Sequence, residues 1–372
     1  MYIKVITTDN ELDEVKNEWL SFEKKLGNQN ITSSYIWQRT WWKYFKDYEK
    51  GNFGYDKRLC ILFLYNKQDM LRAIVPLCEV TRKKRGVKCE TIEFMAQQWG
   101  ATYLDIISDK LSEEEYNFIF DWLKNNKRYD LIELKYIPEF TPNFDLSKNN
   151  ITVLSACPEI ISDTYDSVKN NYYGKNLRRK LRRIKNKVKR EDINLTTSCL
   201  SSNQILNRFA EMREASISKE LNSKHSLYRD TRIENFVRGL VKLHSEKAKC
   251  FCIEYNGKVV AYNLGFEVNK KYYALDAAYS RNEKKLENLS LGNLNYDYLT
   301  QYVLDKGIKN LCLGPGIDSY KLKFSKQIVR IYTFLKKGNT LKAVPLYIIK
   351  KRQNRRIEKK FNEELKRNLK RG

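Results

Sequence analysis

The stretch from Lys258 to Phe324 carries the pattern that decides the fold: KVVAYNLGFEVNKKYYALDAAYSRNEKKLENLSLGNLNYDYLTQYVLDKGIKNLCLGPGIDSYKLKF. Its apolar runs and breakers predict two strands, a polar loop, a helix, a third strand and a glycine turn, in this order: 259–267, 271–279, 280–290, 292–306, 309–313 and 314–316. The turn leads directly to Tyr320 and Lys321. We expect this stretch to form the reactive half of the protein.

An Asn256-Gly257 pair precedes this stretch and follows a further predicted strand, 249–255. Asn-Gly is the strongest short-range signal for a β-hairpin, because both residues accept the positive φ of the turn. The sequence therefore predicts a three-stranded antiparallel meander and then a helix that begins at Gly292. The first amides of such a helix lack intrahelical partners and favour an anion such as a pyrophosphate.

Length and charge narrow the class of protein. At 372 residues the chain exceeds the size at which one core keeps growing, so we expect two domains. A hydrophobic content of 42% indicates a folded protein rather than a disordered one. The 70 Lys and Arg against 45 Asp and Glu give a net charge of +25, which attracts nucleic acid, anionic lipid, phosphorylated sugars or coenzyme A without distinguishing among them.

The sequence lacks the marks of export and of a metal site. No apolar run approaches the roughly 20 residues of a membrane span, and the first residues do not form a secretory signal, so we expect a cytoplasmic protein. The 8 cysteines are scattered in apolar surroundings, as buried thiols are in a reducing compartment. Cys250 and Cys252 alternate across a strand and cannot share a metal, so no metal is expected.

The N-terminal half is predicted to be an α/β unit. An aromatic-rich helix begins at Ser33 or Ser34, both natural caps. Strands are predicted at 58–65, 71–80, 91–95, 102–107 and 130–136, and a helix is predicted at 111–126. No glycine-rich phosphate-binding motif occurs among these elements. This half of the chain is therefore expected to bury and position other groups rather than to carry out a reaction. Pro138 and Pro142 mark a boundary region.

A basic amphipathic helix is predicted over residues 172–190. It contains Lys and Arg throughout, with no acidic residue, and a stripe of Leu177, Leu181, Ile184 and Val188 at helical spacing. A solvated surface helix and a site for substrate phosphate, tRNA or membrane are both compatible with this pattern. The only histidines are His225, in a polar loop and a candidate for substrate contact, and His244, expected on the surface near a helix C-terminus.

Short motifs along nearly the whole chain resemble the GNAT acyltransferase superfamily, specifically its CelD-like acetyltransferase branch, which is related to the Fem-type aminoacyl transferases. They comprise the Trp37 and Trp41 helix with 71–77, Tyr103-Leu104-Asp105, the basic run 176–181, the hairpin 257–261 with Tyr272-Tyr273, and Gly307 to Phe324. Two departures occur. The family's Ser-Pro-Gly at the helix start is Ser290-Leu291-Gly292 here, and the acidic residue before the final glycines is replaced by Cys312-Leu313.

The resemblance implies an α/β (α+β) fold of two tandem GNAT-like domains, each a mixed, mostly antiparallel sheet flanked by helices. We expect a degenerate domain over residues 1–155, an acyltransferase domain over 156–340, and a basic helical tail over 341–372. The tail could lie on anionic lipid or simply be solvated.

The resemblance also implies direct attack of an amine or hydroxyl on the thioester of acetyl-CoA or another acyl-CoA. Such a reaction needs a base, oxyanion donors and an acid for the thiolate. The expected catalytic residues are Asp276, Tyr279, Tyr320 and Lys321. The expected donor-binding residues are Ser290, Gly292 and Asn293, and Arg178, Arg179 and His225 are expected to contact the substrate.

Structural alternatives remain for three of these residues. Asp276 could pair with Lys321 or Arg281, Tyr320 could belong to the core, and Lys321 could be a surface lysine.

The function expected from the resemblance is acyl transfer to a small-molecule or glycan-precursor acceptor of envelope or polysaccharide assembly, with peripheral contact with an anionic membrane as an option. The first alternative is a Fem-type transferase that uses aminoacyl-tRNA. The second, of another class, is a non-catalytic nucleic-acid or membrane-surface adaptor.

Overall fold

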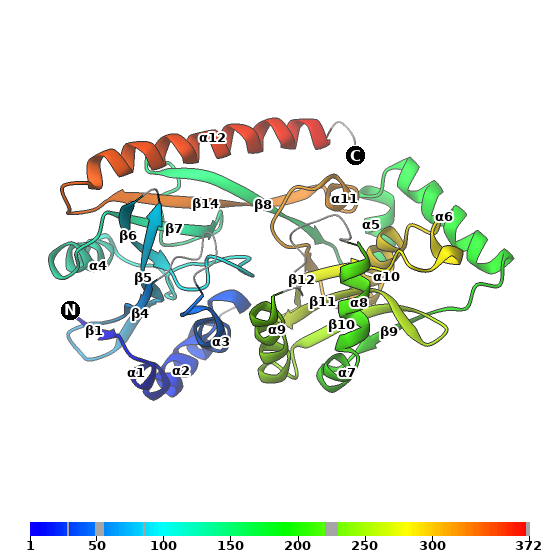
Figure 1. Ribbon diagram of the computed structural model, residues 1–372, viewed down its shortest axis with the longest axis horizontal. Coiled ribbons are helices and arrows are strands. Elements are labelled where there is room, and N and C mark those ends of the chain that lie inside the picture. The colour runs from blue at the N-terminus through cyan, green and yellow to red at the C-terminus, as the bar shows by residue number, and fades with distance from the viewer. Residues whose placement is uncertain (28–29, 49–55, 85, 220–229, 370–372) are drawn as a thin grey trace. The chain divides into compact units, whose positions relative to one another are not determined.

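The computed structural model describes residues 1–27, 30–48, 56–84, 86–219 and 230–369 (Figure 1). The chain forms two compact units. The first comprises Met1–Ala156 and Val329–Glu364, and the second Cys157–Ile328 and Leu365–Gly372. The domain limits expected above remain a prediction; the compact units group most residues from Val329 onward with the first unit.

The first unit combines two sheets with helices. One sheet has the order β1-β3-β4, and the strands of this unit in the other sheet have the order β2-β5-β6-β7-β14. The strands are β1 (Tyr2–Ile6), β2 (Asp56–Leu59), β3 (Ile61–Tyr65), β4 (Leu71–Val75), β5 (Leu77–Lys84), β6 (Val87–Phe94), β7 (Leu131–Pro138) and β14 (Gln327–Lys337). The helices are α1 (Asp9–Glu14), α2 (Lys16–Leu26), α3 (Tyr35–Phe45) and α4 (Glu113–Asn126), with α12 (Ala343–Leu369) shared between the units.

Two predictions in the first unit have different outcomes. Ser34 caps α3, because its side chain accepts the Trp37 amide, so that helix start is confirmed. The strand predicted at 102–107 is wrong: this segment is irregular apart from an isolated bridge between Ile107 and Ile74. The reason is that a side chain replaces a strand partner, since Asn30 Nδ2 donates to the Tyr103 carbonyl at 2.6 Å.

The second unit is built around a sheet whose strands have the order β8-β13-β12-β11-β10-β9. Its strands are β8 (Ile151–Ile161), β9 (Leu195–Leu200), β10 (Ala248–Tyr255), β11 (Lys258–Val268), β12 (Lys271–Tyr279) and β13 (Asn310–Cys312). Its helices are α5 (Tyr165–Asn171), α6 (Lys175–Arg190), α7 (Ser202–Asn207), α8 (Phe209–Lys219), α9 (Thr231–Leu243), α10 (Leu291–Asp305) and α11 (Ser319–Leu322).

The predicted hairpin joins β10 to β11. Asn256 and Gly257 have φ angles of 51° and 77°, the left-handed values that a two-residue turn requires. Antiparallel pairing continues from β11 to β12, so the predicted meander is confirmed.

The only parallel pairing of this unit among the described strands joins β12 to β13. It begins at Lys271 opposite Asn310 and ends at Tyr273 opposite Cys312. Beyond that point β12 continues to Tyr279, whereas the segment that follows β13 turns away through Gly314. The two strands therefore separate, and the sheet opens between them.

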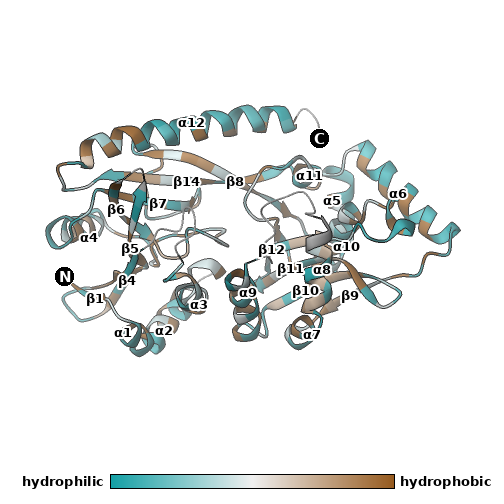
Figure 2. Cartoon of the chain, viewed as in Figure 1, coloured by the Kyte–Doolittle hydropathy of each residue, from teal (hydrophilic) through white to brown (hydrophobic). Residues whose placement is uncertain are grey.

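Burial in the second unit bears on two predicted features, the basic helix and His244. In α6, the buried residues are Leu177, Leu181 and Ile184, and most of the other residues of the helix are hydrophilic (Figure 2). The surface position expected for His244 is wrong. The residue is 4% exposed, and its ring packs edge-on against Phe266 at 5.7 Å. The apolar surface of β11 covers the helix end on which it lies.

No helix in the described ranges has both the length and the apolar character of a membrane span.

Candidate active site

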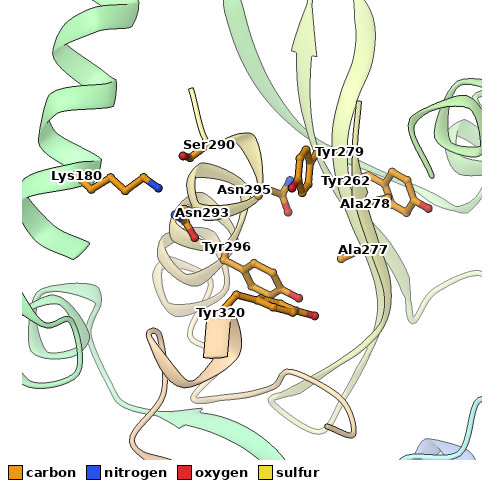
Figure 3. Close-up of a pocket in the computed structure, with 11 residues that line it drawn as sticks. Lys180, Tyr262, Ala277, Ala278, Tyr279, Ser290, Asn293, Asn295, Tyr296 and Tyr320 are labelled. Atoms are coloured by element: carbon orange, nitrogen blue, oxygen red, sulfur yellow. The ribbon is translucent and has the colours of Figure 1, made fainter. Parts of the chain in front are cut away.

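A pocket of about 300 Å³ opens where β12 and β13 separate (Figure 3). Residues from α6, β11, β12, α10 and α11 line it: Lys180, Tyr262, Ala277, Ala278, Tyr279, Ser290, Gly292, Asn293, Asn295, Tyr296 and Tyr320. The structure thus brings together the predicted residues Tyr279, Ser290, Gly292, Asn293 and Tyr320, which come from three separate segments of the chain.

The N-terminus of α10 forms one wall. Ser290 has a left-handed backbone with φ 44°, and its carbonyl accepts the amides of Asn293 at 2.9 Å and Leu294 at 3.2 Å. Among the described residues, the amides of Leu291 and Gly292 have no acceptor. Two free amides at the positive end of a helix form a site for an anion.

Gly292 is needed there because Tyr279 packs against it. A Cβ at this position would lie 3.1 Å from Cε1 of Tyr279, tighter than ordinary contact. The ring of Tyr279 also lies under the Arg281 guanidinium, 5.8 Å from its carbon atom. The close approach explains why the helix begins with a glycine even without the family's proline.

Lys180 supplies the positive charge among the described lining residues. It extends from α6 toward the first turn of α10, near Asn293 (Figure 3). An ammonium group beside free helix amides strengthens the preference for an anionic ligand. The sequence marked the basic helix but not this residue; its position on the flank of the apolar stripe was the available signal.

Tyr296 and Tyr320 form a pair in the pocket, where Tyr296 is buried and Tyr320 remains 40% exposed. Their ring centroids are 5.8 Å apart, and their hydroxyls share a hydrogen bond. Burial raises the pKa of Tyr296 well above its usual value, and the hydrogen bond to Tyr320 adds to this. Burial also raises the pKa of Tyr320 to about 12, helped by the negative charge of Asp318. Both phenols are therefore protonated at neutral pH and available as proton donors.

Asp276 is held next to the pocket by a lining residue. The Tyr262 hydroxyl donates a 2.6 Å hydrogen bond to its Oδ2. The β11–β12 register shifts here: Leu264 lies opposite Asp276, and Gly265 lies opposite Ala274. Leu275 is thus an extra residue, a β-bulge of the kind that re-aims side chains next to active sites.

Asn295 was not predicted. Its side chain lines the pocket and is 2% exposed, yet its Nδ2 has no hydrogen-bond partner in the described chain. A buried amide without an acceptor costs stability, so the position suits a ligand carbonyl or phosphate oxygen.

A family model described as acetyltransferase (GNAT) domain matches residues 175–322, which include every residue that lines this pocket. Residues 175–322 form a GNAT acetyltransferase domain. Such a domain implies an acyltransferase enzyme, and its co-substrate is in general an acyl-CoA.

Solved structures support the fold over most of the chain. FemX is 12% identical, with a TM-score of 0.57, over 94% of this chain and 100% of its own. A conserved protein of unknown function from Bacteroides thetaiotaomicron is 11% identical, with a TM-score of 0.53, over 89% and 99%. L-PGS from Bacillus licheniformis is 14% identical, with a TM-score of 0.50, over 92% and 96%. The predicted mixed α/β fold of tandem GNAT type is thereby confirmed, whereas identities this low say nothing about substrate.

Among curated proteins, no match is found.

Lys321 lies outside the lining of the GNAT pocket. It is 7% exposed, and its Nζ donates to the carbonyls of Gly314 at 3.1 Å and Pro315 at 2.7 Å. Gly314 and Gly316 have φ angles of 75° and 107°, which expose these carbonyls to the ammonium group. Lys321 thus closes the glycine turn that precedes Tyr320. Its expected role in stabilising anionic charge remains a prediction.

Arg178 and Arg179 line a different groove. It has a volume of about 640 Å³ and is formed by α5, α6 and α10. At its base, the fully buried Asp297 pairs with Lys185 at 2.8 Å and accepts the Tyr165 hydroxyl at 2.6 Å. The substrate contact expected for both arginines remains a prediction, and His225 lies outside the described residues.

Within the described ranges, no group of three or more His, Cys, Asp or Glu residues could hold a metal ion.

Proposed function

We propose that the protein transfers an acetyl group from acetyl-CoA to an amine or hydroxyl of a sugar or another precursor of envelope or polysaccharide assembly. The observation that carries the proposal is a pocket that combines an anion-binding helix start, a lysine and a protonated tyrosine pair, with a carboxylate next to it that Tyr262 holds. This set matches the three requirements of acyl transfer: donor binding, a base and an acid.

Donor binding is assigned to the free amides of Leu291 and Gly292 together with Lys180. These groups suit the pyrophosphate of coenzyme A, whose thioester supplies the activated acyl group. The Asn295 amide is available to a carbonyl of the same ligand. At the bulge, the ladder is interrupted at Leu275, and backbone amides there are candidates for the developing oxyanion.

Proton transfer is assigned to Asp276 and Tyr320. The Asp276 carboxylate accepts the proton of the attacking amine or hydroxyl, directly or through water, and Tyr262 fixes its orientation. Tyr320 donates its proton to the departing sulfur, because its raised pKa of about 12 keeps it protonated. Tyr296 then supports Tyr320 through their shared hydrogen bond. Tyr279 is assigned to packing of the donor site rather than to proton transfer.

Two measurements test this proposal. Isothermal titration calorimetry with acetyl-CoA should give saturable one-site binding that Lys180→Ala weakens. Release of free CoA thiol should then be stimulated by at least one member of a panel of amino sugars and nucleotide sugars. Absence of any CoA binding would refute the proposal.

An aminoacyl-tRNA-dependent reaction is the second candidate. The basic groove beside α6 favours it. A salt titration of tRNA binding separates the two candidates: tight tRNA binding without affinity for CoA would favour the tRNA reaction.

A further inference from the structure

The helix α12 is packed on one side only. Ala343, Asn354 and Phe361 lie on the packed side, and each is at most 5% exposed. Their spacing places them on one face of an α-helix. Salt bridges fix the first part of the helix, from Lys342 to Asp130 at 3.2 Å and from Lys350 to Glu133 at 3.1 Å. The opposite face is therefore presented to solvent in a defined orientation.

Aliphatic side chains gather at the start of this outward face. Leu341, which precedes the helix by two residues, is 103% exposed, and Val344, Ile348 and Ile349 on the helix are 48%, 45% and 52% exposed. We refer to these four residues as the aliphatic patch. Figure 2 shows the apolar residues of α12 concentrated in its first turns. Scattered exposed aliphatic residues are ordinary, but a group of neighbours on one face indicates an interaction surface.

Basic side chains continue the same face. The exposed Arg352, Arg355, Arg356, Lys359 and Lys360 follow the aliphatic patch, and we refer to them as the basic patch. Between Leu341 and Ile357 the sequence contains no acidic residue. Glu358, the next one, accepts the Val153 amide at 3.0 Å and so is engaged with the protein.

We infer that the aliphatic patch and the basic patch together bind the surface of an anionic phospholipid bilayer. Aliphatic residues beside Lys and Arg on one helix face are the combination that lies in a membrane interface, with the apolar groups at the acyl boundary and the cations at the headgroups. Nucleic acid would use the basic patch but not the aliphatic one. A second copy of the chain would place like charges opposite each other. The inference does not depend on the proposed acyl transfer.

Vesicle co-sedimentation of the full chain tests the inference. Binding to vesicles of phosphatidylcholine with phosphatidylglycerol should exceed binding to phosphatidylcholine alone at least tenfold, and high salt should reduce the difference. The pair Leu341→Glu with Ile348→Glu, and separately the pair Arg352→Glu with Arg355→Glu, should each weaken binding at least tenfold. All four side chains face solvent, so unchanged thermal unfolding is expected.

Matched control variants distinguish binding by the α12 surface from the effects of net charge and of exposed apolar residues elsewhere. Arg183→Glu with Arg190→Glu makes the same charge change on α6, and Leu243→Glu changes a leucine that is 57% exposed on a different surface. Both controls should bind vesicles within about twofold of the unmodified protein. Loss of a basic residue that does reach the membrane surface would weaken binding about fivefold, which is a larger change than this limit. Equal losses in controls and α12 variants would overturn the inference.

Insertion is tested by Ile348→Trp. Vesicles with brominated acyl chains should quench this variant more than the unmodified protein. Lack of additional quenching, or capture of RNA rather than vesicles, would also overturn the inference.

Discussion

Across the central hairpin, the Tyr262 hydroxyl donates a 2.6 Å hydrogen bond to the carboxylate of Asp276. The donor lies on β11 and the acceptor on β12, next to a bulge at Leu275. Tyr262 is fully buried, so its ring cannot move away from this contact without opening the core. The bond fixes the direction in which the Asp276 carboxylate points relative to the pocket.

We expect Asp276→Asn to lower kcat by at least about a hundredfold, the contribution typical of a general base. Tyr262→Phe should lower kcat by roughly tenfold, because it leaves the carboxylate present but free to rotate. Initial rates of CoA release across a pH series measure both effects. If Tyr262 only stabilises the fold, Tyr262→Phe will lower the unfolding temperature without changing the pH profile of kcat.

The Tyr320 hydroxyl is expected to act as the acid. Tyr320→Phe should lower kcat by at least tenfold with little change in KM for acyl-CoA. Because the pKa of Tyr320 is raised to about 12, its phenol stays protonated across the usual assay range. Its own deprotonation should therefore contribute no loss of activity below about pH 10, two units under that value. Tyr302→Phe, a change on α10 outside the pocket lining, is the control. Unchanged kcat in Tyr320→Phe would remove Tyr320 as the acid, and an alkaline loss of rate below about pH 10 that disappears in Tyr320→Phe would contradict its raised pKa.

The donor site is tested by two variants. Lys180→Ala should weaken acetyl-CoA binding roughly 10- to 100-fold, as loss of a charge-assisted hydrogen bond does. Gly292→Val should also weaken it, because a Cβ there meets Tyr279 at 3.1 Å. Calorimetry measures both, with Lys187→Ala on the same helix as the control, since Lys187 pairs with Glu191 and does not line the pocket. An unaltered Kd in Lys180→Ala would remove this lysine from the site.

Lys321→Met tests the glycine turn. The change leaves the carbonyls of Gly314 and Pro315 without their donor, which should cost about 1–3 kcal/mol of unfolding free energy. Displacement of the adjacent Tyr320 should lower turnover at least tenfold even at temperatures where the variant is folded. Circular dichroism and rate measurements on the same sample distinguish the two effects; full turnover in folded Lys321→Met would exclude any catalytic contribution.

The sequence predicted the scaffold of the site better than its chemistry. Asn256-Gly257, the alternating strands and the glycine in the first turn of α10 are local signals, and local conformational preferences decide them. Lys180, Asn295 and Tyr296 were missed because their role depends on which helix flank faces the separated strands, and that is a tertiary relationship. The strand predicted at 102–107 is wrong for the same reason. The carbonyl of Tyr103 accepts a hydrogen bond from the side chain of Asn30, which lies 73 residues away in sequence.

His244 gives a prediction of acid sensitivity. Burial lowers the pKa of His244 from 6.5 to about 3. The folded protein therefore stays unprotonated at this residue where the unfolded chain takes up a proton, so stability falls as pH decreases from about 6.5 toward 3. The slope is about 1.4 kcal/mol per pH unit, or about 2 kcal/mol between pH 6.5 and pH 5. Denaturant unfolding at pH 7.5 and at pH 5 measures it, and His244→Leu should reduce the difference by about that amount. If His244→Leu and the unmodified protein lose equal stability between these pH values, His244 is not the titrating group, and the buried carboxylates of the first unit become the next residues to test.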